Sequence, residues 1–315
     1  MFKYIILVAI SSVALKSPAW SIMDATNGGP KTREQLQKEY DDAINSGDAE
    51  RSDELWARLN GFDYTLNSYD SLSSDKAPQT ARELCKLNDS PYGINQLLAN
   101  ADNRMAFTNL SGDLGTGLCW WHSSLTRSAA MLSIYQPDKP RPNKKEAERI
   151  IDTLIAMNGI VTIPGFSNWR EFSEYFSSEL ESKMSAWQRS EALNFGWLRG
   201  LKGTSKSSED LRANLELAEH DFRLYKKPVY AMLQFAGPMA HSWLILDIKK
   251  TETGFRMFVL DSNTSTVDRW DYQFGQESII YPGLSGFIPY VQPKERQDLF
   301  KLQSLTDKFC KPYKK

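Results

Sequence analysis

The hydrophobic pattern of this 315-residue chain changes near Pro228 from the period of helices to the spacing of strands. Upstream, apolar residues recur every three or four positions, which predicts helices over residues 119–135, 144–158, 169–193 and 208–225. Downstream, short runs rich in Val, Ile, Phe, Tyr and Trp predict strands over residues 229–235, 241–250, 255–263, 270–274 and 286–291, followed by a helix over 293–309. Helices followed by strands indicate an α+β fold in which the two kinds of element are segregated.

The first 21 residues have the features of a secretory signal peptide. Lys3 supplies a positive charge, residues 4–15 are apolar, and Ala19 and Ser21 are small residues at the positions that a signal peptidase reads. The apolar run is shorter than the roughly 20 residues that a membrane-spanning helix needs. We therefore expect export to the periplasm or the extracellular space, a mature chain beginning near Ile22, and no stable membrane insertion.

Two further segments follow the signal peptide. Residues 22–80 are polar and favour helix, with a helical pair over 32–59 that breaks near Ser46 and a Ser- and Pro-bearing linker over 71–78. This region is either a pro-segment, a subdomain or a helical wrap around the main domain. Residues 81–315 carry the remaining predicted elements and form that main domain.

Composition excludes several functional classes. The chain has 38 Lys and Arg against 39 Asp and Glu, with no block of like charge, so we expect no nucleic-acid partner. Its three cysteines are too few for a disulfide scaffold and do not form a four-ligand zinc pattern. Cys119 and His122 are spaced to face one metal ion, but no second pair completes such a site. Phosphate-loop, dinucleotide and G-x-S-x-G motifs are absent from the sequence, so we expect no cofactor.

Cys119 is the first candidate for chemistry. It follows a Gly-rich turn containing Gly115 and Gly117 and begins the predicted helix over 119–135. At a helix N-terminus, unpaired N–H groups and the helix dipole favour a thiolate, which is the nucleophilic form of cysteine. The alternative is a buried, inert cysteine.

The second candidate is a histidine on a predicted hairpin. The strands over 241–250 and 255–263 are joined by a short Gly-containing connection, so a fold-back near residues 251–253 sets His241 roughly opposite Asp261 or Asn263. These two residues are two positions apart, so either can share a face with His241, and Ser262 faces the other way. A neighbouring carboxylate or amide orients a histidine as a base.

The order Cys, His, Asp/Asn, with Cys on a helix and His on a hairpin, resembles the papain-like cysteine peptidases. The residues that carry the resemblance are Gly117, Cys119, Trp120, Ser123, His241, and Asp261 or Asn263. The resemblance implies a papain-like catalytic domain over 81–315, acting on a peptide or protein substrate. Cys119 then attacks a carbonyl, His241 carries the proton, and Asp261, or Asn263 in its place, orients the imidazole.

The sequence departs from that family's pattern around the oxyanion site. Six positions before the cysteine the family usually has a Gln, where this chain has Asp113. The candidates for the oxyanion site are therefore position 113 itself, Asn109, and the backbone N–H of Cys119. The family's Trp after the orienting residue is also missing, which favours a divergent branch such as the bacterial bacteriocin-processing peptidases.

Two alternatives remain open at this point. Transglutaminase-like proteins use the same residue order, and residues 240–243 (AHSW) with 259–261 (VLD) resemble their His and Asp strands. A catalytically inactive binding protein on the same scaffold is the other alternative, since fold does not imply function.

The cysteine count predicts one disulfide. Disulfides persist outside the cytoplasm, and an odd number of cysteines in an exported chain leaves one unpaired. If Cys119 stays a thiol, the remaining pair is Cys85 and Cys310. Their bridge would clip the terminal helix to residues near 85; the alternative is two unrelated buried thiols.

Overall fold

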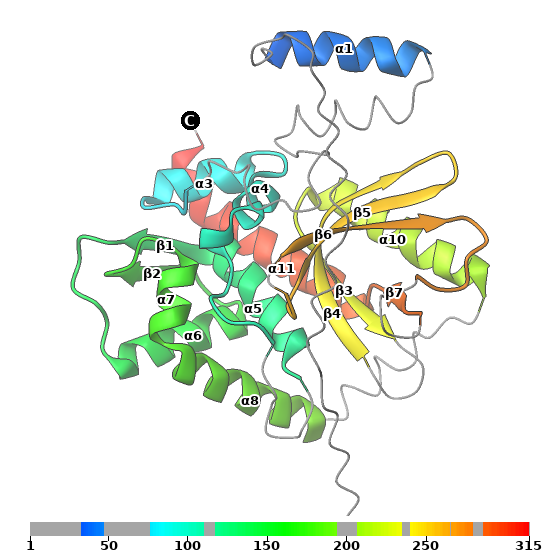
Figure 1. Cartoon of the computed structure of the whole chain (residues 1–315). Coiled ribbons are helices and arrows are strands. Elements are labelled where there is room, and N and C mark those ends of the chain that lie inside the picture. The colour runs from blue at the N-terminus through cyan, green and yellow to red at the C-terminus, as the bar shows by residue number, and fades with distance from the viewer. Residues whose placement is uncertain are drawn as a thin grey trace, which may run out of the picture.

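The computed structural model describes residues 33–46, 76–109, 117–193, 207–234, 240–264, 266–279 and 286–314. These residues form an α+β protein, as the sequence predicts, with a helical half and a half built on an antiparallel sheet (Figure 1). The predicted signal peptide, residues 47–59 of the helical pair, Asp113 and Gly115 lie outside the described residues. The first half of that pair is helix α1 (Arg33–Ser46), which ends at the predicted break.

The sheet has five strands in the order β6-β5-β4-β3-β7. They are β3 (Val229–Gln234), β4 (Ala240–Lys250), β5 (Gly254–Asp261), β6 (Val267–Gln273) and β7 (Ile288–Tyr290), and every neighbouring pair is antiparallel. Gly254 begins β5 where β6 passes close, since a Cβ there would lie 1.7 Å from the Tyr272 carbonyl oxygen. Only glycine fits so tight an approach.

Strands β3, β4 and β5 are buried on both faces, and alternate residues face different cores. Trp243 and Ile245 pack with helix α10 (Ser208–Tyr225), whose apolar residues Leu211, Leu215 and Phe222 lie on one side. Leu244 and Leu246 instead join the core of the helical half. This two-residue alternation explains the apolar run of β4 over residues 243–246, whereas the edge strand β6 alternates between buried and exposed residues.

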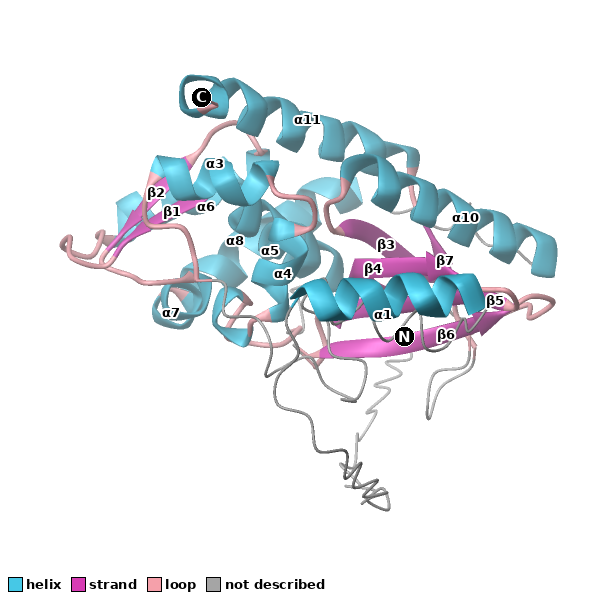
Figure 2. Ribbon diagram, turned by 90° about the horizontal axis from the view of Figure 1, so that it is seen from above, coloured by secondary structure: helices cyan, strands magenta, loops and turns pink. Residues whose placement is uncertain are grey.

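The helical half surrounds α5 (Cys119–Leu132), which is buried along almost its whole length. The other helices of this half, in sequence order, are α3 (Ala81–Asp89), α4 (Gly93–Ala99), the short 3₁₀ helix η1 (Ala101–Asn103), α6 (Lys144–Ala156), α7 (Trp169–Tyr175) and α8 (Ser177–Leu193). In Figure 2, α10 and the long C-terminal helix α11 (Pro293–Cys310) follow one another along one side of the molecule, and Arg296 of α11 pairs with Asp221 of α10 where they meet. The 3₁₀ turn η2 (Lys311–Tyr313) follows α11.

Two helix predictions need correction. The helix predicted over 119–135 ends at Leu132, and residues 133–136 form strand β1 (Ser133–Gln136), which pairs in parallel with β2 (Val161–Pro164). Short apolar runs fit helix and buried strand equally well, and a partner distant in sequence decided this one. The helix predicted over 169–193 is divided into α7 and α8 at Phe176, whose ring is buried beside Phe172.

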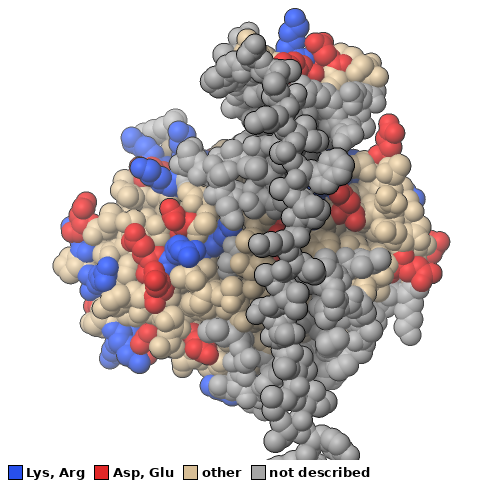
Figure 3. Space-filling view, in the orientation of Figure 1, with Lys and Arg blue, Asp and Glu red and all other residues tan. Residues whose placement is uncertain are grey.

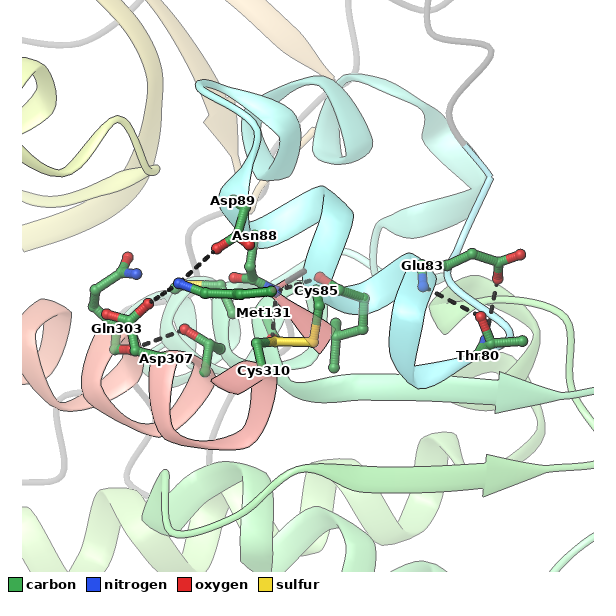
Figure 4. The surroundings of a disulfide bond; sticks show 12 residues. Thr80, Glu83, Cys85, Asn88, Asp89, Met131, Gln303, Asp307 and Cys310 are labelled. Atoms are coloured by element: carbon green, nitrogen blue, oxygen red, sulfur yellow. Dashed lines mark hydrogen bonds and ion pairs between the residues drawn. A yellow bond between two sulfur atoms is a disulfide. The ribbon is translucent and has the colours of Figure 1, made fainter. Parts of the chain in front are cut away.

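The C-terminal helix is attached to the helical half at both ends. At its end, the sulfur atoms of Cys85 and Cys310 lie 1.99 Å apart, the length of a disulfide bond, with Cα atoms 5.3 Å apart (Figure 4). Near its start, Glu295 forms a buried ion pair with Arg127 of α5 and accepts a hydrogen bond from the Tyr230 backbone N–H at 2.9 Å. The terminal helix is thus part of the main domain's core.

Surface charge is mixed where the structure describes it. Lys and Arg side chains alternate with Asp and Glu over the helical half in Figure 3, with no large patch of one sign on the coloured part of this face. Within the described ranges, none of the helices combines the length and the apolar character that crossing a bilayer requires.

Candidate active site

Helix α5 sets Cys119 at its first position. The residue before it, Leu118, makes no side-chain hydrogen bond to the helix N-terminus, so the first N–H groups of α5 have no side-chain cap. Cys119 is only 5% exposed and is the one free cysteine that the described residues contain. A thiol therefore lies beside uncapped N–H groups, the environment that its sequence position predicts.

Helix α5 is fixed to the sheet one turn further along. The Ser242 hydroxyl of β4 lies 3.2 Å from the Ser123 hydroxyl of α5, and both residues are buried. Leu125 of α5 and Leu244 of β4 belong to the same apolar core. These contacts fix the position of the cysteine relative to the strand that carries His241.

His241 and Asp261 are joined by a short hydrogen bond. Nε2 of His241 lies 2.7 Å from Oδ1 of Asp261, and their side chains are 7% and 2% exposed. Cys119 also lies near enough to His241 to raise the pKa of the imidazole. Because Nε2 faces the carboxylate, Nδ1 is the ring nitrogen left to face the thiol. The structure thus brings the three predicted residues together.

The register of the hairpin explains this contact. Trp243 pairs with Asp261, so His241, two residues earlier, is the diagonal neighbour of Asp261 on the same face rather than its direct partner. A bulge between Ile245 and Asp247 produces this register. Without the bulge, the pairing of Lys250 with Phe255 would continue to Leu244 opposite Asp261, which would turn the carboxylate to the other face.

Asn263 lies in the turn after β5, and within the described part of the chain its hydrogen bonds go to Asp261 and Asn109 rather than to the imidazole. Its backbone N–H donates to Oδ1 of Asp261 at 2.8 Å, and its side-chain oxygen accepts from Nδ2 of Asn109 at 3.0 Å. The Asn109 backbone N–H also donates to the Ser262 carbonyl at 2.7 Å. Asn263 therefore supports the carboxylate that orients His241.

Asn109 connects this turn to the cysteine. A Cβ added to Gly117 would lie 2.4 Å from Nδ2 of Asn109, so the amide packs directly against the backbone two residues before Cys119. Glycine at this position allows the close approach. Nδ2 of Asn109 already donates to Asn263, so the amide expected near an oxyanion has a structural partner here. Asp113, at the other predicted position, lies outside the described residues.

The charge state of His241 is set by its two partners. Burial by itself lowers the pKa of His241, but the hydrogen bond to Asp261 and the negative charge of that carboxylate, with a contribution from the neighbouring Cys119, outweigh burial and raise it to about 10. The imidazolium form is therefore stabilised at neutral pH. A positively charged imidazole beside a cysteine is one of the environments in which cysteines act as nucleophiles.

His122 is a second histidine beside this site, and its sequence position gave no sign of its role beyond the spacing to Cys119. Burial, with a smaller contribution from the charge of His241, lowers its pKa to about 4. Its Nε2 lies 2.8 Å from the Phe107 carbonyl oxygen, which makes Nε2–H the donor of the neutral ring. His122 thus anchors the segment that leads to Asn109.

Gln188 is a further residue that sequence reasoning missed. It is buried on α8, and its Nε2 donates to the Gly117 carbonyl at 3.2 Å. Nothing in the sequence links position 188 to position 117.

His220, predicted to be an ordinary solvated residue, is exposed on α10. No group of three or more His, Cys, Asp or Glu in the described ranges is arranged to hold a metal ion.

Comparisons with known proteins add no relative. A scan against protein-family models, a search of curated proteins and a search of solved structures each found no match to this chain. Its chemistry is therefore inferred from the geometry of the site.

Proposed function

We propose that this chain is an exported thiol hydrolase that cleaves peptide or amide bonds through Cys119, His241 and Asp261, on a papain-like domain formed by residues 81–315. The observation that carries the proposal is the buried 2.7 Å contact between Nε2 of His241 and Oδ1 of Asp261, beside a cysteine at the start of a helix. The packing of that helix on an antiparallel sheet supports the papain-like architecture.

Each residue has a distinct role in this reaction. The Cys119 thiolate attacks the carbonyl carbon and forms a C–S bond, and the backbone N–H of Cys119 donates to the oxyanion. His241 gives its Nδ1 proton to the leaving amine as the C–N bond breaks. A water molecule then attacks the thioester carbonyl, His241 takes the water's proton, and the Cys119 thiolate leaves as the C–S bond breaks, which restores the starting state and releases the acid. Asp261 holds the Nε2–H throughout and stabilises the imidazolium.

A reactive-cysteine experiment tests the proposal. We expect iodoacetamide to label Cys119 of the mature chain, beginning at Ile22, stoichiometrically and faster than a free thiol at pH 6, as measured by intact mass. His241→Ala should slow labelling at least tenfold, because the thiolate loses its imidazolium partner. His220→Ala is the matched control, since this exposed histidine lies on α10 and makes no contact that the reaction uses.

The same preparation distinguishes the alternatives. Release of fluorescence from a quenched peptide library by the wild-type chain, but not by Cys119→Ala, supports hydrolysis. Incorporation of a fluorescent amine into an acceptor protein would favour acyl transfer of the transglutaminase type. Labelling no faster than that of a free thiol, unchanged by His241→Ala, would contradict thiol catalysis and favour a binding protein.

A further inference from the structure

A groove of about 530 Å³ lies beside strand β2, and none of its lining residues belongs to the cysteine site. Its walls come from β2, from α6 and from the segment 140–142. In Figures 1 and 2, β1 and β2 lie at the opposite end of the molecule from the five-stranded sheet. The volume falls within the range of sites that bind small molecules or short peptide segments.

One edge of β2 faces this groove with a free backbone pair. The N–H of Gly165 donates to the Gln136 carbonyl of β1 at 2.7 Å. Position 165, and with it positions 163 and 161, therefore point their backbone groups toward β1. Because successive residues of a strand point their N–H and C=O groups to opposite edges, those of Thr162 point away from β1. Thr162 is exposed, lines the groove, and has no backbone hydrogen bond to any described residue.

The other edge of this small sheet is already covered. The N–H of Tyr135 in β1 donates to the Pro78 carbonyl at 2.8 Å. Pro164 ends β2 and has no N–H, which limits pairing along the free edge to a few residues. The geometry therefore suits a short extended segment.

The side chains of the groove favour a carboxylate. Arg149 is exposed and forms no ion pair with the described residues, and Arg141 stacks on Phe166 and Tyr175, with its guanidinium carbon 4.9 and 4.7 Å from the ring centres. Glu146 is the one acid in the lining, and its carboxylate accepts the Asn143 backbone N–H at 2.9 Å as part of the α6 cap. Two arginines thus face a groove whose one acid is already engaged.

We propose that this groove binds an extended, carboxylate-bearing peptide segment that adds to the free edge of β2. The peptide backbone would pair with the N–H and C=O of Thr162, its apolar residues would pack on Ile150 and Val161, and its carboxylate would bind Arg149. This is recognition by strand addition, in which the backbone supplies affinity and alternate side chains supply specificity. The groove binds its peptide whether or not Cys119 is catalytic.

A binding assay on the Cys119→Ala chain tests the groove without cleavage of the probe. The probe is a fluorescein-labelled, acetylated peptide of alternating valine and glutamate, and fluorescence polarisation reports binding. We expect Arg149→Glu and Thr162→Pro each to weaken binding about fivefold or more, the loss of one charged contact or one backbone hydrogen bond. Arg170→Glu, an exposed charge reversal on α7, and Thr162→Val, which keeps the N–H, should change it less than twofold.

Probe variants provide the remaining evidence. Replacing glutamate by lysine, or methylating alternate backbone nitrogens of the peptide, should reduce binding at least tenfold, because the first removes the carboxylates and the second removes the donors of the added strand. Equal binding of the methylated peptide, or no effect of Arg149→Glu, would overturn the proposal. If Thr162→Pro fails to fold, Arg149→Glu still tests the proposal. No binding of the probe by the Cys119→Ala chain at millimolar concentration would refute the proposal.

Discussion

Removal of the link between Cys85 and Cys310 should destabilise the chain more than any single surface change. The two cysteines are 225 positions apart, and a closed loop of that length restricts the unfolded chain by about 5 kcal/mol in the chain-entropy model. Measured losses for native disulfides run from roughly 2 to 5 kcal/mol. We expect Cys85→Ala/Cys310→Ala to lower the free energy of unfolding within that range.

Urea unfolding followed by tryptophan fluorescence measures this loss. With an m-value of about 3 kcal/mol/M for a chain of this size, the midpoint should fall by roughly 0.7 to 1.7 M. All measurements use a Cys119→Ala background, so that the free thiol cannot exchange with the disulfide. The oxidised parent should fall to the midpoint of the double variant when reductant is added, and the double variant should not respond to reductant.

The native state should change little near the start of α11. Glu295 remains paired with Arg127 in the double variant, so amide exchange around it should become faster only by the factor that the loss of global stability sets, with no added local opening. If the urea midpoints of the oxidised parent and the double variant agree within about 0.2 M, the disulfide does not stabilise the chain as the chain-entropy model predicts, and this prediction is wrong.

Three further predictions concern the candidate site. Asp261→Asn should slow iodoacetamide labelling roughly a hundredfold at pH 6, whereas Asn263→Ala should slow it less than tenfold; the reverse order would make Asn263 the orienting residue. Gly117→Ala should displace the Asn109 amide and slow labelling roughly tenfold, with no further loss when Asn109→Ala is already present; additive losses would contradict a shared contact. His122 keeps a pKa of about 4 in the fold against about 6.5 in the unfolded chain, so its contribution to stability is present above pH 6.5 and is lost as pH falls toward 4, by about 3 kcal/mol. His122→Gln should remove this slope from the pH dependence of urea midpoints, and an unchanged slope would assign it to other groups.

The sequence by itself determined most of the elements. Apolar periodicity placed α10 over 208–225 with no error, and in the structure Asn143 with Glu146 forms the capping box that begins α6. Alternating apolar runs placed the five strands within a few residues of their ends. These features depend on local backbone preferences and on burial of one face, which neighbouring residues specify.

Elements whose state depends on a distant partner were not predictable in this way. Residues 133–136 extend an apolar helix in sequence, yet they form β1 because residues 161–164 supply a parallel partner. The break at Phe176 likewise follows from packing against Phe172 and Phe166. Gln188 reaches Gly117 across 71 positions of sequence, a contact that only the packing of α8 on α5 creates.

The choice between Asp261 and Asn263 shows where sequence reasoning stops. Strand alternation predicted that either residue could share a face with His241, because side chains repeat every two residues. A bulge at Leu246 shifts the register by one residue and turns Asp261 to the face of the imidazole, and β5 ends at Asp261, which leaves Asn263 in the turn that follows. Residue types and their order are local properties that the sequence carries, whereas register is a property of the paired strands and was decided by the tertiary structure.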